Sequence, residues 1–281
     1  MNFSNSNIWN NSFALRYSVN KIKKINDLYF YENNNLLKCQ HFFEFNIKDD
    51  DLKKMKIEID KNKVIKFSYL NDSVLTKKLN NWAEKNNFNY QVLDEWEAPR
   101  LVLNSKQDIS EYLKKNSHSQ IAKNYKKYCI EKSKYKFYNS SINDSLWLWN
   151  FVLDIDYNSW KKTEESDMKS LDREDLQYLP LLLIDKDNSN LLVMFDEMDN
   201  PLAYSLMFRY DKYWYAVKWG ASNLGRKKYA GFYCLFNHLE YLYSIDNSLY
   251  IDFWGRRNET YDKLRNDYII RKHISISRKE G

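Results

Sequence analysis

With 281 residues, 43% of them hydrophobic, the chain is long enough for one large domain or two small ones, and it is too apolar to be disordered throughout. Its formal net charge of +6 is spread thinly, because Lys and Arg alternate with Asp and Glu along the sequence. A duplex-DNA binder usually gathers its basic residues on one face, so that class is disfavoured. The most apolar run, 178–184, is far shorter than the roughly 20 residues of a membrane-spanning helix.

The cysteines and the N-terminal residues bear on the compartment. Cys39, Cys129 and Cys234 lie far apart and form no Cys-x-x-Cys pair, which predicts neither a disulfide framework nor a metal site. The first residues show no charged leader followed by an apolar core, as a signal peptide would. We therefore expect a cytoplasmic protein without a bound metal.

The first hundred residues alternate between apolar and polar side chains, which is typical of strands. The predicted strands are 13–19, 28–32, 42–47 and 64–70. A helix is predicted over 74–86, and two more strands, 90–93 and 100–103, flank the turn Trp-Glu-Ala-Pro. This part of the sequence carries no catalytic motif.

The spacing of apolar residues becomes helical over 108–132, with Asp108 or Ser105 as the residue that caps the helix. A strand over 134–138 and helices over 144–162 and 171–184 follow. Period-two alternation then predicts three strands joined by tight turns, at 190–197, 201–210 and 212–220. The remaining predicted elements are a helix over 227–243, a strand over 248–255, a helix over 258–267 and a strand over 267–277.

From residue 134 onward, this order of elements matches the topology of the GNAT acyltransferase superfamily, and three segments resemble its FemAB-like and CelD-like branch. They are the basic helix and strand over 108–138, the stretch DIDYNSWKK at 154–162, and the stretch from KWGASNLGRKKYAGF to YDKLRNDY at 218–268. The resemblance covers roughly 105–281 and extends only loosely to the first hundred residues. It implies an α/β (α+β) fold with a mixed, splayed sheet flanked by helices. FemAB-like proteins carry two GNAT-like domains in tandem, so it also implies a degenerate domain at 1–105 and an acyltransferase domain at 106–281.

The activity that this resemblance implies is transfer of an acyl group from acyl-CoA to an amine of a small molecule such as an amino sugar or amino acid. Acetyl-CoA is the favoured acyl-CoA. The superfamily's phosphate loop runs Arg/Gln-x-x-Gly-x-Gly/Ala, and here Tyr229 stands at the first glycine of the stretch from Arg226 to Gly231. That departure leaves the donor open between acyl-CoA, an acyl carrier protein and an aminoacyl-tRNA. A second class also stays open: a non-catalytic module that binds RNA or a protein partner on a GNAT scaffold.

The resemblance assigns roles residue by residue. Lys227, Lys228, Ala230 and Gly231 are expected at the start of the long helix, beside the diphosphate of the donor. Lys218, Trp219 and Arg226 complete this donor-binding set. The alternative for the cations is a solvated basic turn.

The catalytic and acceptor roles follow from the same resemblance. Tyr261 is expected to protonate the departing thiolate, unless it is a packing residue. Asp252 is expected to act as the base, with pairing to a nearby Arg as the alternative. Trp160 and Lys161 are expected to line the acceptor pocket, or else to belong to the core. Cys234 and His238 share a helix face, and we interpret them as packing residues.

Overall fold

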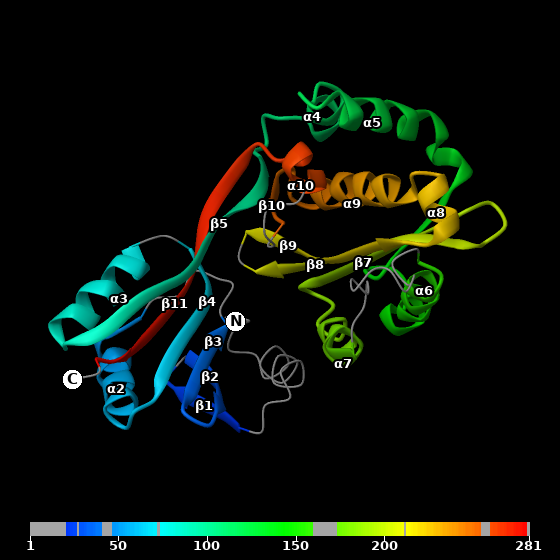
Figure 1. Ribbon diagram of the computed structural model, residues 1–281. Coiled ribbons are helices and arrows are strands. Elements are labelled where there is room, and N and C mark those ends of the chain that lie inside the picture. The colour runs from blue at the N-terminus through cyan, green and yellow to red at the C-terminus, as the bar shows by residue number, and fades with distance from the viewer. Residues whose placement is uncertain are drawn as a thin grey trace. The chain divides into compact units, whose positions relative to one another are not determined.

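The computed structural model describes residues 21–26, 28–40, 47–71, 74–159, 173–210, 212–253 and 259–279 (Figure 1). Contacts divide the chain into two compact units: unit 1 comprises Met1–Ala98 with Ile269–Gly281, and unit 2 comprises Pro99–Tyr268. The last strand thus groups with the N-terminal residues, whereas the sequence analysis places it in the domain at 106–281. Its residues pair with a strand of unit 1, and sequence order does not reveal that pairing. That unit 1 is a degenerate copy of unit 2 stays a prediction.

Unit 1 is built on a sheet with the strand order β1-β2-β3-β4-β11. Its strands are β1 (Lys21–Ile25), β2 (Leu28–Asn33), β3 (Leu36–Gln40), β4 (Val64–Asn71) and β11 (Asp267–Arg278), together with the first part of β5 (Phe88–Leu103). Only β3 and β4 run parallel among the pairs in this order, and the chain between them forms α2 (Asp49–Asp60). After β4 comes α3 (Val74–Lys85), the helix predicted at 74–86.

Parts of unit 1 differ from the sequence prediction, and other parts of that prediction cannot be compared. The two strands expected around the Trp-Glu-Ala-Pro turn form one continuous strand, β5. Helix α2 was not predicted, although Leu52, Met55 and Ile59 are buried at helical spacing. The strand predicted at 13–19 and most of the one predicted at 42–47 lie outside the described residues.

Unit 2 has a sheet with the strand order β5-β10-β9-β8-β7-β6. Its other strands are β6 (Lys136–Asn139), β7 (Ser189–Phe195), β8 (Pro201–Tyr210), β9 (Tyr213–Ala221) and β10 (Leu249–Asp252). The helices are α4 (Ile109–Lys114), α5 (Ser119–Glu131), α6 (Ser145–Tyr157), α7 (Arg173–Leu182), α8 (Asn223–Lys227), α9 (Ala230–Asp246) and α10 (Glu259–Leu264). Strands β10 and β9 run parallel and the other recorded pairs are antiparallel, so the sheet is mixed.

Helices cover both faces of this sheet. In Figure 1, α9 lies on one face with α5 above it, and α6 lies on the other. Every residue of β7 is accordingly buried. The predicted mixed sheet flanked by helices is confirmed.

Two predicted helices differ in the structure, one in its continuity and one in its start. The helix predicted at 108–132 divides into α4 and α5, and Asp108 caps α4 by accepting a hydrogen bond from the backbone N–H of Glu111 at 2.8 Å. The helix predicted at 227–243 begins only at Ala230, after the short helix α8.

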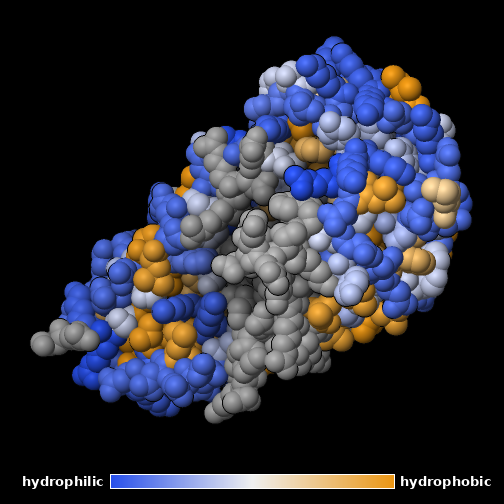
Figure 2. Space-filling model, turned by 45° about the vertical axis from the view of Figure 1, so that its right-hand side comes forward, coloured by the Kyte–Doolittle hydropathy of each residue, from blue (hydrophilic) through white to orange (hydrophobic). Residues whose placement is uncertain are grey.

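The described residues on the face seen in Figure 2 are largely hydrophilic, with apolar patches. On α6, the side chains of Leu146, Leu153 and Tyr157 share one helix face and are 54%, 37% and 70% exposed. No helix in the described part of the chain is both long and apolar enough to cross a membrane.

Candidate active site

The pairing of β9 with β10 ends at one end of the sheet of unit 2. Their last paired residues are Tyr215 on β9 and Asp252 on β10. Beyond that pair β9 continues to Ala221, whereas the next residue of the other chain segment, Phe253, donates its N–H to the carbonyl of Pro99 at 3.1 Å. That the sheet splays between these two strands, as the resemblance implied, stays a prediction.

A β-bulge lies on β9 where it leaves β10. Ala216 pairs with Met207 on β8 and Lys218 pairs with Leu206, so Val217 has no partner on β8. The extra residue of a bulge leaves the hydrogen-bond ladder and changes the direction of the side chains that follow it. The sequence analysis missed this bulge, because alternation over 212–220 predicts an uninterrupted strand.

The residue before α9 has a left-handed backbone conformation, although it is not a glycine. Tyr229 adopts the left-handed conformation, with φ of 57° and ψ of 22°, at the position of the first glycine in the phosphate-loop pattern. This conformation is favoured by Gly and is strained for other residues, so the surrounding structure must impose it. The first N–H groups of α9, at Ala230 and Gly231, follow directly and carry the positive end of the helix dipole.

Packing on the sheet fixes the position of this loop. A Cβ on Gly225 would lie 2.1 Å from the carbonyl oxygen of Leu202, so only glycine lets α8 approach β8 this closely. Ser222 caps α8 by accepting a hydrogen bond from the N–H of Gly225 at 3.1 Å.

The predicted donor-binding cations differ in their surroundings. Arg226 and Lys227 are exposed, and Lys218 is half-buried. The ammonium of Lys228 lies 3.1 Å from the carboxylate of Asp196, which is buried at the end of β7. Burial raises the pKa of Asp196, but hydrogen bonds from Asn200 and Lys228 outweigh it, so that pKa lies below its ordinary value. Lys228 is thus an anchor of the loop.

The rings of Tyr261 and Trp219 are neighbours, and Trp219 lies on the part of β9 that is beyond its last pair with β10. The ring of Tyr261 stacks on that of Phe253 with centroids 4.6 Å apart, and its centroid is 6.1 Å from that of Trp219. Burial raises the pKa of Tyr261, so its phenol is protonated at neutral pH, as a general acid must be.

Asp252 is fully buried and paired. Its carboxylate accepts a hydrogen bond from Nε of Arg100 at 2.9 Å, and the Arg100 guanidinium lies 4.5 Å from the ring centroid of Tyr213. Burial lowers the pKa of Arg100, but the Asp252 carboxylate outweighs it, so that pKa lies above its ordinary value. A carboxylate in a buried ion pair makes a poor base, because its protonation would leave the Arg100 charge uncompensated. The ion pair with Arg100 matches the alternative given for Asp252, which was pairing with a nearby arginine.

Comparison with protein-family models gives no match, and comparison with curated protein sequences gives none either. Solved structures do resemble the chain. FemX has a TM-score of 0.66 and 10% identity, with 97% of this chain and 91% of FemX covered. The L-PGS from Bacillus licheniformis has a TM-score of 0.59 and 10% identity, with coverage of 90% and 81%. A tandem GNAT protein from the clavulanic acid biosynthesis pathway has a TM-score of 0.51 and 7% identity, with coverage of 89% and 77%.

The fold is GNAT-like. At identities this low the likeness shows the fold and leaves the activity to be argued from the site. The two residues expected to line the acceptor pocket, Trp160 and Lys161, lie outside the described residues.

Cys234 and His238 face the core of the GNAT-like unit. The Cys234 thiol points to the carbonyl oxygen of Leu192 at 3.7 Å, and burial raises the pKa of that thiol. His238 contacts Ser205 through Nδ1 and Asn190 through Nε2, each at 2.9 Å. The Asn190 carbonyl oxygen only accepts, so Nε2 carries the proton and Nδ1 accepts from the serine hydroxyl. These contacts agree with the interpretation as packing residues.

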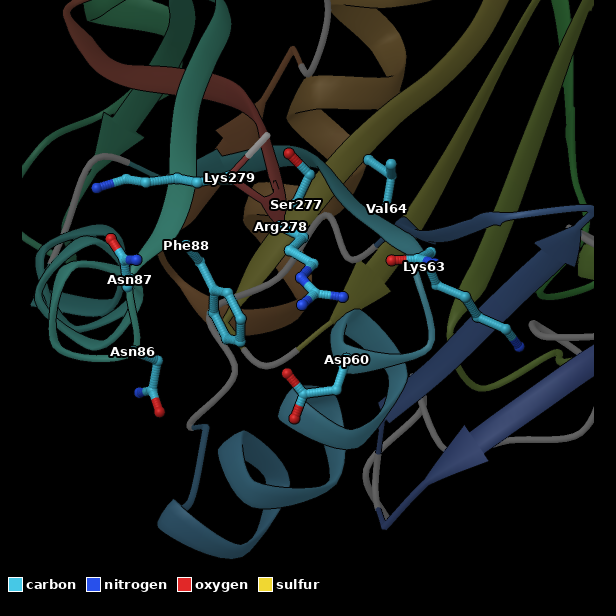
Figure 3. Close-up of a pocket in the computed structure, with 10 residues that line it drawn as sticks. Asp60, Lys63, Val64, Asn86, Asn87, Phe88, Ser277, Arg278 and Lys279 are labelled. Atoms are coloured by element: carbon cyan, nitrogen blue, oxygen red, sulfur yellow. The ribbon is translucent and has the colours of Figure 1, made fainter. Parts of the chain in front are cut away.

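A pocket of about 770 Å³ lies in unit 1 (Figure 3). It is lined by the ends of α2, α3 and β11, with Asp60, Asn87, Phe88, Arg278 and Lys279 among its residues. Figure 3 shows Arg278 extending from β11 toward Asp60. The negative ends of two helices and the cations at the end of β11 oppose each other in sign. The pocket therefore favours no single class of ligand.

Proposed function

We propose that the protein is an N-acyltransferase that moves an acyl group from a thioester donor to an amine of a small molecule such as an amino sugar or amino acid. Among acyl-CoA donors, acetyl-CoA is the one we favour. The observation that carries the proposal is the left-handed conformation of Tyr229. This residue precedes α9 at the end of the sheet where the pairing of β9 with β10 stops. A helix start of this shape presents free N–H groups and a positive dipole end, which suit a diphosphate. The cytoplasm, where we expect the protein to act, holds such donors.

Two further features support a donor site here. The side chains of Arg226 and Lys227 are exposed beside the helix start and add positive charge for an anionic donor. The bulge at Val217 frees backbone groups close to the point where the strands part. Backbone N–H groups at such a place are suited to stabilise the negative charge that develops on a thioester carbonyl oxygen.

The reaction we propose is direct transfer. The neutral amine attacks the thioester carbonyl carbon, the C–N bond forms, and the C–S bond breaks. The departing thiolate takes the phenolic proton of Tyr261, and the amine loses a proton to solvent. The paired state of Asp252 gives it no part in these steps.

Ligand-induced stabilisation of the full-length protein tests the proposal. At about 100 times its Kd, acetyl-CoA is expected to raise the free energy of unfolding by about 2.7 kcal/mol, which appears as a higher Tm. Lys115→Ala is a matched control that removes an exposed lysine away from the loop, and it should show the same rise. No rise with acetyl-CoA or with free CoA would contradict the proposal. A shift that appears with tRNA instead, and falls steeply with salt, would favour the aminoacyl-tRNA donor.

A further inference from the structure

Trp219 occupies the space between β9 and the first turn of α9. Its ring centroid is 6.2 Å from that of Phe232 on α9 and 6.1 Å from that of Tyr261 on α10. A Cβ built on Gly231 would lie 3.1 Å from Cζ3 of the Trp219 ring, so the indole rests against the bare backbone of that glycine. The Trp219 ring, which belongs to β9, therefore packs against both α9 and α10.

The bulge at Val217 explains why a tryptophan points here. Trp214 and Ala216 belong to the core under α9, and plain alternation would turn Lys218 and Gly220 to that side next. The extra residue shifts the alternation by one, so Trp219 and Ala221 face α9. Gly220 consequently faces the opposite side, where a Cβ would meet the ring of Tyr204 at 2.8 Å.

This position has a consequence for any donor that binds as proposed above. A donor whose diphosphate lies at the N–H groups of Ala230 and Gly231 must pass its arm along β9 to reach the bulge at Val217. Trp219 lies between these two places along β9, and its ring covers Gly231. The arm and the indole cannot occupy that space together.

We propose that Trp219 controls access of the donor arm: its ring closes the passage in the free protein and turns away when a donor binds. This inference rests on the proposed function. Aromatic pairs like those of Trp219 with Phe232 and Tyr261 change an equilibrium by about 2- to 10-fold each. A donor that must break them binds more weakly by the fraction of protein in the open state.

Isothermal titration with CoA itself, on the full-length chain, tests the inference. Trp219→Ala removes the obstruction and should bind CoA about 10-fold more tightly than the wild type, with faster association. Trp219→Phe keeps a smaller ring and should fall between them. Trp147→Ala, a change to an exposed tryptophan on α6, should leave the affinity unchanged.

A second variant covers the case in which Trp219→Ala fails to fold. Trp219→Leu keeps apolar volume beside Phe232 without the indole ring, so it too should bind CoA more tightly than the wild type provided its fold is intact. Each outcome is decisive. Equal or weaker CoA binding by these variants, with binding by the wild type, overturns the role of Trp219 and leaves the proposed function standing. Absence of CoA binding in the wild type and in every variant overturns both.

Discussion

Arg100 and Asp252 face each other on the adjacent strands β5 and β10, and Nε of the arginine lies 2.9 Å from the carboxylate. Their positions are separated by 152 residues in sequence. The pair is buried, and Asp252 also forms the last residue pair of β10 with β9.

Replacing one member of this pair should destabilise unit 2. Asp252→Asn leaves the Arg100 charge buried without its partner, which costs about 3–5 kcal/mol in the free energy of unfolding. Urea denaturation measures the loss. Glu111→Gln breaks the exposed ion pair with Lys115 and should change the free energy of unfolding far less, because solvent screens that pair. A stable Asp252→Asn protein with a large fall in kcat would instead show that the carboxylate acts as the base.

Tyr261→Phe removes the proposed acid and keeps the ring that stacks on Phe253. We expect kcat to fall by about 10²-fold, since the thiolate then leaves without its proton donor, while Tm and CoA affinity stay close to those of the wild type. Steady-state kinetics with acetyl-CoA measures the change. If Tyr261→Phe turns over like the wild type, the tyrosine packs against its neighbours and has no part in proton transfer.

The two neighbouring lysines of the loop should respond differently. Lys227 is exposed, so Lys227→Ala should raise the KM for the donor with little effect on kcat or Tm. Lys228→Ala also removes the partner of the buried Asp196 carboxylate, so it should lower Tm as well. Kinetics and thermal melts of both variants test this distinction. An unchanged donor KM in Lys227→Ala would mean that this lysine has no contact with the donor.

The pH dependence of stability should carry the signature of His238. Burial lowers the pKa of this imidazole from 6.5 to about 3, so it stays neutral in the folded protein. In the unfolded chain it takes up a proton below about pH 6.5, which favours unfolding as the pH falls. Between pH 7 and pH 5 the loss from this one group is about 2 kcal/mol.

A difference measurement isolates that contribution. Urea denaturation at pH 7 and pH 5 should show a smaller pH dependence in His238→Asn than in the wild type. His118→Asn, at an exposed position before α5, should keep the dependence of the wild type. If the pH dependence of His238→Asn equals that of the wild type, the imidazole takes up its proton over the same pH range in the folded and the unfolded protein.

The sequence by itself determined the order and type of most elements of the second half. Period-two alternation and helical spacing reflect the geometry of one strand or one helix, so β7, β8, β9 and α9 are visible in it. The likeness of the loop before Gly231 to a phosphate loop also came from local order alone. The left-handed backbone conformation of Tyr229 needed the structure, because no local pattern requires it.

Only the tertiary structure decided what depends on pairing between distant segments. The Arg100–Asp252 contact, the grouping of β11 with β4 and the fusion of two expected strands into β5 all follow from strand register, which alternation does not encode. The bulge at Val217 shifts that register by one residue, and this shift turns Trp219 toward α9 in place of Lys218. The family resemblance points to Trp219 as a residue of the expected donor site, and the register of β9 against β8 decides that its ring lies against Gly231 at the start of α9.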